Sequence, residues 1–327
     1  MSKEGIYKNL CTQIDRIYRQ TNEKSFKTRA RYLEATYRFC EFLSEKYPMQ
    51  NFASVRSKHL KAYVEQMKAK GQSASTIKTD ISGIRFFHER CGSKYRLCKN
   101  ENLNLPKRES NPKINKAWTK EEIENAKMYA LQCSGQKVDG KAVYLAISLG
   151  EKFGARLEEA CRVEVNHVKE ALRDGSLYIK GKGGLVRYVP VRTAEQRQTL
   201  RELLAYAQSN KLTGGEKIIP SFNSKNSVKE TKKSIQNWIA RNLGHFQDTS
   251  RERMAKDEKV KAELLAVGVK PPKDTLSFHG LRHTYCQTRI KELETDSILT
   301  KREIDLKVSK ELGHHRAAVT RIYMGQF

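Results

Sequence analysis

The chain has 327 residues, of which 63 are Lys or Arg and 37 are Asp or Glu, so its formal net charge at pH 7 is +26. This length predicts two domains, each large enough to bury its own core. The charge predicts a polyanionic partner, with nucleic acid ahead of a membrane surface. No apolar run approaches the ~20 residues of a membrane-spanning helix, and we expect neither a signal peptide nor a membrane partner.

The cysteines indicate a reducing compartment. They are odd in number and form no C-x-x-C pair. Scattered thiols of this kind usually act as small buried apolar residues, so we expect a cytoplasmic protein without disulfides. The seven are Cys11, Cys40, Cys91, Cys98, Cys133, Cys161 and Cys286.

Residues 1–104 predict a compact helical domain. Apolar residues recur at three-to-four spacing from Ile6 to Tyr18, which predicts a first amphipathic helix. Further helices are expected over 25–45, stopped by Pro48, and over 57–69, ended by Gly71. A fourth begins near a capping serine, Ser73 or Ser75, and continues through Phe87.

The fourth helix carries two basic residues, Lys78 and Arg85, on a flank that need not be buried. They meet DNA phosphates in one interpretation and only solubilise the helix in the other. The sequence gives the two interpretations about equal weight.

Residues 105–117 predict a basic, proline-bearing linker, and the second domain is expected over 118–327. This domain opens with a capping box, Thr119 and Glu122. Helices are expected near 123–131, 143–151, 194–208 and 227–243, with a glycine-turned hairpin over 177–190. The fold class expected is mainly α with a small antiparallel β-sheet.

The C-terminal third holds an unusual set of polar residues. His279 and Arg282 lie three apart on an expected helix that Ser277 can cap, so their side chains point the same way. His314 follows Gly313, which is placed to end another helix, and Tyr323 comes nine residues later. Taken singly, each is more often structural. Together they make a poor metal site and a good anion site beside a hydroxyl.

These residues, in this order and spacing, resemble the C-terminal signature of the tyrosine recombinases, the phage integrase family. Residues 153–159 are similar to the family's first arginine motif, with Arg156 at the catalytic position and Glu159 at the supporting acidic one. The turn Gly181-Lys182-Gly183 is similar to the one that presents the catalytic lysine, and Lys180 is the competing candidate. The first hundred residues resemble the family's helical core-binding (SAM-like) domain.

The resemblance implies a chemistry that suits these residue types. Arg156 and Arg282 can clamp the non-bridging oxygens of a phosphodiester, because a guanidinium is a charged planar fork of donors. His279 and His314 can donate to the same oxygens or accept the proton of the attacking hydroxyl.

In the same scheme, Tyr323 supplies the nucleophile and forms a covalent 3′-phosphotyrosine. Lys182 is suited to protonate the departing 5′ hydroxyl. The linkage energy stays in the covalent intermediate, so no cofactor and no metal is expected.

The expected function is therefore site-specific recombination of double-stranded DNA, as by the integrase of a mobile element. A homotetramer on DNA is implied by the resemblance alone, and an accessory protein that sets direction is left open. One alternative is a resolvase or topoisomerase-like enzyme with the same chemistry. Another is a sequence-specific DNA-binding protein that has the fold without the activity.

Three features depart from the pattern or stand outside it. Four residues follow Tyr323, fewer than in many relatives, which puts the mode of subunit exchange in doubt. Residues 247–274 are charged and irregular and are interpreted as an insertion. Leu243-Gly244-His245 repeats the tripeptide before Tyr323 with no tyrosine at the required distance, so we interpret it as a helix end followed by a loop.

Overall fold

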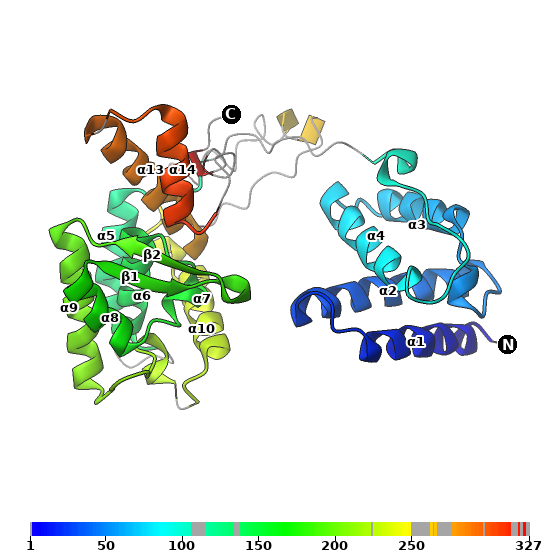
Figure 1. The fold of residues 1–327 in the computed structure, drawn as a ribbon, viewed down its shortest axis with the longest axis horizontal. Coiled ribbons are helices and arrows are strands. Elements are labelled where there is room, and N and C mark those ends of the chain that lie inside the picture. The colour runs from blue at the N-terminus through cyan, green and yellow to red at the C-terminus, as the bar shows by residue number, and fades with distance from the viewer. Residues whose placement is uncertain are drawn as a thin grey trace. The chain divides into compact units, whose positions relative to one another are not determined.

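The computed structural model divides the chain into two compact units, residues 1–110 and 111–327, each described here by itself (Figure 1). The point of division falls inside the segment predicted as a linker. The structure describes residues 2–105, 115–133, 138–223, 225–249, 262–263, 265–266, 276–296, 298–314, 320 and 323–324.

The first unit is made of four helices, as predicted. They are α1 (Lys3–Gln20), α2 (Phe26–Lys46), α3 (Ser57–Ala69) and α4 (Ala74–His88), with 3-10 turns at Phe52–Ser54 and Asn100–Leu103. The hydroxyl of Ser25 caps α2 by accepting from the Thr28 amide, and Ser73, not Ser75, caps α4.

The core of this unit forms where α2 packs against α1 and α4. Phe39, Phe52 and Phe87 are fully buried in it. A Cβ added at Gly83 of α4 would lie 3.0 Å from the Tyr32 Cα, so this glycine allows the backbones of α2 and α4 to approach closely.

The second unit is mainly helical, with one antiparallel hairpin. Its helices are α5 (Lys120–Gln132), α6 (Gly140–Phe153), α7 (Leu157–Ala160), α8 (Val165–Asp174), α9 (Ala194–Ser209), α10 (Val228–Arg241), α13 (Phe278–Asp296) and α14 (Lys301–Glu311). The strands are β1 (Ser176–Lys180) and β2 (Val186–Pro190), joined through a 3-10 turn at Lys182–Gly184. Other 3-10 turns lie at Ile219–Phe222 and Leu243–His245.

Helix α6 is central in this unit, because it packs against α5, α9 and α13. Most of its residues are buried, as expected of a helix that is apolar on nearly every side. The predicted capping box is present: the Thr119 amide donates to Glu122 at 2.8 Å and the Glu122 amide donates to Thr119 at 3.1 Å. The predicted fold class is confirmed.

Two other expectations are tested only in part. The repeated tripeptide forms the 3-10 turn Leu243–His245 directly after α10, where the ring of His245 stacks on Tyr129 with centroids 4.0 Å apart. Most of the predicted insertion 247–274 lies outside the described residues.

No helix in the described part of the chain is long and apolar enough to cross a membrane.

Candidate active site

Arg156 is positioned by a sharp break between two helices. Gly154 ends α6 with a φ of 59°, a conformation that favours glycine, and Arg156 becomes the cap of α7. Its main-chain amide donates to Oε2 of Glu159 at 2.8 Å, and its Nη1 donates to Oε1 at 2.7 Å. One carboxylate therefore fixes both the backbone and the guanidinium of Arg156.

Arg282 projects from α13 and is fully buried. Its Nη1 donates to the carbonyl of Gly154 at 2.6 Å, its Nη2 to the carbonyl of Leu312, and its Nε to the Tyr323 hydroxyl at 3.2 Å. Burial lowers the pKa of Arg282 to about 10, so the group stays charged at neutral pH. With five N–H donors in a guanidinium and three in use, two remain.

His314 lies between Arg156 and Tyr323 and contacts both side chains. Helix α14 ends at Glu311, and Gly313, with a φ of 69°, turns the chain into His314. The Nε2 of His314 lies 3.1 Å from Nη2 of Arg156 and 3.2 Å from the Tyr323 hydroxyl. A guanidinium only donates, so Nε2 accepts from Arg156 and the ring proton is on Nδ1.

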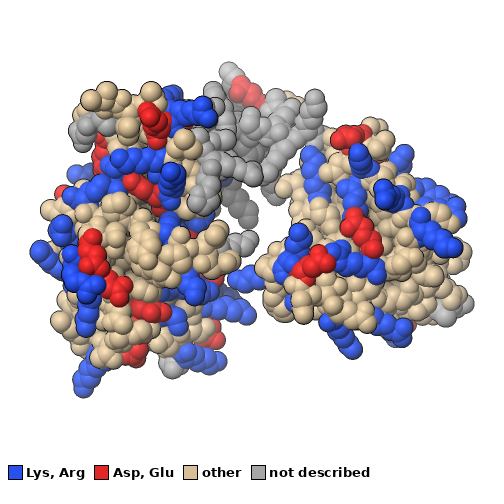
Figure 2. Space-filling model, in the orientation of Figure 1, with Lys and Arg blue, Asp and Glu red and all other residues tan. Residues whose placement is uncertain are grey.

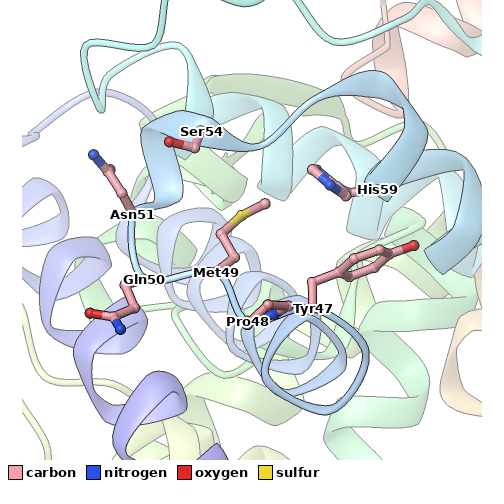
Figure 3. Close-up of a pocket in the computed structure, with 7 residues that line it drawn as sticks. All are labelled: Tyr47, Pro48, Met49, Gln50, Asn51, Ser54 and His59. Carbon is pink, nitrogen blue, oxygen red and sulfur yellow. The ribbon is translucent and has the colours of Figure 1, made fainter. Parts of the chain in front are cut away.

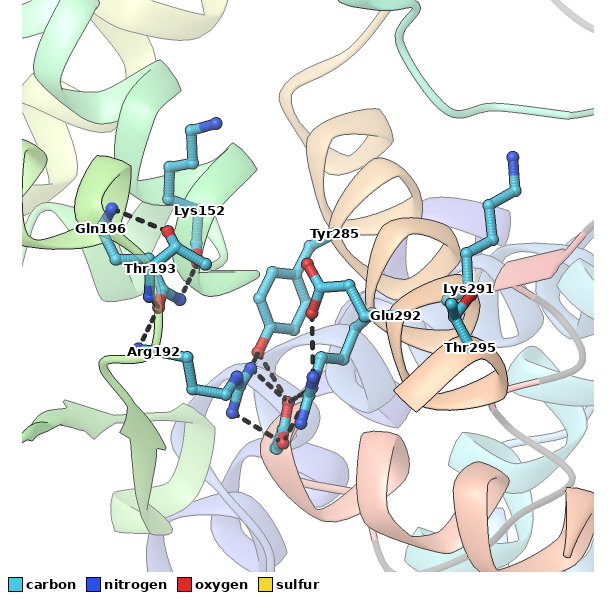
Figure 4. Close-up of polar contacts among 10 residues, drawn as sticks. Lys152, Arg192, Thr193, Gln196, Tyr285, Lys291, Glu292 and Thr295 are labelled. Carbon is cyan, nitrogen blue, oxygen red and sulfur yellow. Dashed lines mark hydrogen bonds and ion pairs between the residues drawn. The ribbon is translucent and has the colours of Figure 1, made fainter. Parts of the chain in front are cut away.

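The carboxylate of Glu311, three residues before His314, is held in a buried polar network. It accepts from the Tyr285 hydroxyl at 2.7 Å and from Nη1 of Arg192 at 3.0 Å (Figure 4). Arg192 lies two residues after the end of β2, and Tyr285 belongs to α13. The network therefore fixes the end of α14, and with it the turn that carries His314.

The imidazoles of the site are held neutral. Burial, followed by the charges of Arg282 and Arg156, lowers the pKa of His314 to about 4. His279 is an exposed residue, and its ring lies 5.8 Å from the Tyr323 ring, between centroids. Partial burial, and next the charge of Arg282, lowers the pKa of His279 as well. A neutral imidazole can accept the proton of a phenol.

The predicted lysine lies on the hairpin turn. Gly183 and Gly184 have φ values of 74° and 80°, which suit glycine, and the amide of Gly181 donates to the carbonyl of Leu185 at 2.7 Å. Lys182 is the first residue of this turn, and its side chain lies outside what the structure describes. Lys180 is exposed at the end of β1, so the choice between the two lysines stays a prediction.

The two predicted DNA contacts of the first unit differ in their surroundings. Arg85 donates to Oδ1 of Asn100 at 2.8 Å and to the carbonyl of Cys98, and burial lowers its pKa. It therefore ties α4 to the segment that follows. Lys78 is half-buried one turn from the start of α4. Neither belongs to the unit that holds Arg156.

Sequence reasoning missed three residues beside the site. Arg187 of β2 donates from Nη2 to Oε2 of Glu159 at 2.6 Å. His283 and Gln287 of α13 both reach the main-chain carbonyl of Tyr323, from Nδ1 at 3.3 Å and Nε2 at 3.0 Å. The inward position of Arg187 in the alternation of β2 was an available signal. The contacts to a carbonyl leave no sequence pattern.

Glu159 is thus the acidic centre of the cluster. Burial acts to raise the pKa of the Glu159 carboxyl, but hydrogen bonding and charge from Arg187 and Arg156 outweigh it and lower the pKa to about 2. Nη1 of Arg282 lies 3.9 Å from its Oε2. Three arginines around one carboxylate leave an excess of positive charge, which suits a bound anion.

A hollow in the first unit contains none of these residues. It lies between the end of α2 and the start of α3 (Figure 3). Its lining is Tyr47, Pro48, Met49, Gln50, Asn51, Ser54 and His59. The mixed lining offers no charged group for chemistry.

Among the described residues, no group of three or more His, Cys, Asp or Glu side chains could hold a metal ion.

The stability of the protein is expected to fall as the pH drops from about 6.5 toward 4. Burial, and next the neighbouring His279, lowers the pKa of His283 to about 4 from an ordinary 6.5, and His314 is lowered similarly. The unfolded chain therefore takes up protons in this window that the folded chain does not, so acid favours unfolding. Unfolding temperatures measured from pH 7 to pH 5 test this.

His283→Gln is the matched variant, because glutamine keeps a donor for the Tyr323 carbonyl and removes a titrating group. Its unfolding temperature should vary less with pH than that of the wild-type chain. An identical pH dependence in the two proteins would show that His283 does not contribute.

Comparisons with known proteins agree with this architecture. Residues 13–94 match the family model of the phage integrase N-terminal SAM-like domain. No curated protein sequence matches the chain.

Solved structures match over nearly the whole chain. The Tn1549 transposon integrase, in complex with transposon right-end DNA, is 15% identical, with a TM-score of 0.56 over 96% of this chain and 94% of that one. A lambda integrase dimer bound to a core site is 16% identical, with a TM-score of 0.59 over 96% and 94%. XerH site-specific recombinase, bound to a palindromic difH substrate, is 17% identical, with a TM-score of 0.55 over 91% and 75%.

These likenesses cover both units, and the family model covers most of the first. The chain therefore has the tyrosine recombinase fold, with a SAM-like domain at its N-terminal end.

Proposed function

We propose that the protein is a site-specific DNA recombinase that cleaves and rejoins DNA through a covalent 3′-phosphotyrosine at Tyr323. The observation that carries this proposal is the geometry around the Tyr323 hydroxyl. It accepts from Arg282 and contacts His314, and His314 in turn contacts Arg156. One chain of hydrogen bonds thus links the proposed nucleophile, Tyr323, to a proton acceptor, His314, and to two cations, Arg282 and Arg156.

In the proposed cleavage step, Arg156 and Arg282 bind the non-bridging oxygens of the scissile phosphate. A fixed cation is effective here because negative charge grows on these oxygens in the transition state. The Tyr323 oxygen attacks phosphorus, and a neutral imidazole, His279 or His314, accepts its proton. Lys182 protonates the departing 5′ oxygen. Reversal by another 5′ hydroxyl rejoins the strand, so no cofactor or metal is needed.

DNA is the proposed partner of both units. Figure 2 shows Lys and Arg spread over the visible faces of both units, with fewer acidic side chains between them. Residues 1–104 would hold the duplex, 105–117 would link the units, and 118–327 would carry the chemistry. We further propose exchange in a homotetramer, since one similar structure is a lambda integrase tetramer bound to a Holliday junction. We also propose a role as a mobile-element integrase, since another similar structure is the integrase of the Tn1549 transposon.

Two assays test the function. A suicide substrate, nicked so that the short fragment with the free 5′ hydroxyl diffuses away after cleavage, should trap the protein on the 3′ phosphate of the remaining strand. Recombination between two sites separates a recombinase from an enzyme that only relaxes supercoiled DNA. Absence of any adduct with the wild-type chain would favour a DNA-binding protein that has the fold without the activity.

DNA binding should weaken steeply with salt. Each phosphate neutralised contributes a slope of about −0.9 in log K against log salt concentration. We expect Lys78→Ala to reduce the slope by about one. Arg85→Ala should instead lower the unfolding temperature, because Arg85 binds the Cys98 carbonyl and Asn100. A salt-independent affinity would contradict the electrostatic part of the proposal.

A further inference from the structure

Arg187 is a buried arginine that the proposed chemistry does not use. It is 8% exposed, and its Nε has no hydrogen-bond partner among the described residues. Its Nη2 donates to Glu159 at 2.6 Å. A buried guanidinium with an unsatisfied N–H costs free energy that an apolar side chain would not. Its presence on β2 therefore indicates a role for the charge at this position.

The location of Arg187 in the hairpin gives the first indication of that role. Ile179 of β1 and Arg187 of β2 are direct antiparallel partners, and both are buried. Toward the turn, Val186 and Leu185 are 46% and 63% exposed. Ile179 and Arg187 are thus the last buried side chains before the turn that begins at Lys182, and Arg187 is the charged member of the pair.

Glu159 lies between Arg187 and Gly181, the residue that precedes the turn. A Cβ added at Gly181 would lie 3.2 Å from Oε1 of Glu159 and 3.8 Å from Nη1 of Arg187. The same Oε1 accepts from Nη1 of Arg156 at 2.7 Å. One carboxylate therefore lies beside the residue before Lys182, and it accepts hydrogen bonds from both Arg187 and Arg156.

Arg187 also packs against the turn that precedes His314. A Cβ added at Gly313 would lie 3.2 Å from Cδ of Arg187, so the methylene part of the side chain covers this glycine. Arg187 thus connects three segments, which carry Arg156, Lys182 and His314.

We propose that Arg187 is a positioning residue, which holds the hairpin turn, and with it Lys182, against Arg156 and His314. The inference rests on the proposed function. Arg187 does not contact the phosphate in this scheme. It acts on the step in which the Tyr323 oxygen bonds to phosphorus, the bond to the 5′ oxygen breaks, and that oxygen takes a proton from the Lys182 ammonium.

A substrate with sulfur in place of the bridging 5′ oxygen tests this role. A thiol has a pKa near 8.5, so a 5′ thiolate departs without a proton, whereas a 5′ alkoxide needs one. Lys182→Ala is the reference for loss of the proton donor. Its defect should be large on the oxygen substrate and small on the sulfur substrate.

Arg187→Met removes the charge and keeps most of the aliphatic volume. We expect it to slow single-turnover cleavage of the oxygen substrate on the order of 100-fold, as misplacement of a reacting group by about 1 Å does. Most of that loss should disappear on the sulfur substrate. Arg173→Met is the matched control, because the Arg173 side chain is 73% exposed on α8, and it should cleave both substrates at the wild-type rate.

Two outcomes would overturn the inference. One is a wild-type rate for Arg187→Met on the oxygen substrate. The other is an equal loss for Arg187→Met on both substrates while sulfur rescues Lys182→Ala. If Arg187→Met does not fold, Arg187→Lys replaces it, since lysine keeps the charge but cannot reach both Glu159 and Gly313 in the same way. Failure of the wild-type chain to cleave either substrate would instead overturn the proposed function.

Discussion

Tyr323→Phe is expected to abolish covalent attachment of the protein to DNA while DNA binding and folding persist. The variant removes only the hydroxyl that accepts from Nε of Arg282 and contacts Nε2 of His314. The ring is 5% exposed and lies 4.7 Å from the His283 ring, between centroids, so phenylalanine fills the same space. A suicide-substrate gel should show no adduct above background.

Tyr188→Phe is the matched control. Its ring is 62% exposed on β2, and it should form the adduct at the wild-type rate. Digestion of the wild-type adduct and mass spectrometry should place the DNA on the peptide that contains Tyr323. An adduct formed by Tyr323→Phe would place the nucleophile on another residue, and the assignment of the whole cluster would fail with it.

Local signals explain why most of the fold could be predicted. The capping box at Thr119 and the glycine at 313 each act within one turn of helix, so the neighbouring residues alone are enough to predict them. The alternation from Leu177 to Val189 likewise determines the hairpin register. The one ambiguity among the helix starts, Ser73 or Ser75, was a difference of two residues.

The gathering of the site residues has a different origin. Arg156 and His314 contact each other although 158 positions separate them. Local patterns indicate the helix ends beside them, but not that α13 packs on α6 or that Arg282 reaches the carbonyl of Gly154. The resemblance to a known family predicted that the site residues converge, and the physical pattern alone did not.

Arg187 shows where pattern reasoning fails. The alternation of β2 points it inward with Val189, yet a charged side chain at such a position is normally assigned to solvent. Its burial depends on Glu159, 28 residues earlier, and on Gly313 in the last part of the chain. A buried ion pair requires both partners to be placed, and only the tertiary structure does that.

Arg282→Lys is expected to reduce the rate of cleavage on the order of 100- to 1,000-fold, as removal of one preorganised donor does in other enzymes. Lysine keeps the charge but replaces a planar fork by a single ammonium. It cannot donate at once to Gly154, Leu312 and the Tyr323 hydroxyl, as Arg282 does. Because buried carbonyls would lose their partners, the unfolding temperature should also fall.

Arg156→Lys separates catalysis from stability. The Arg156 side chain is 32% exposed, whereas that of Arg282 is fully buried, and Glu159, the acidic partner of Arg156, still accepts from Arg187 when Arg156 is replaced. We expect a comparable loss of cleavage rate with a smaller change in unfolding temperature. Single-turnover cleavage and thermal unfolding measured on both variants test this. Wild-type cleavage by Arg282→Lys would mean that its guanidinium serves the fold alone, because a direct role on the phosphate needs the planar donors that lysine lacks.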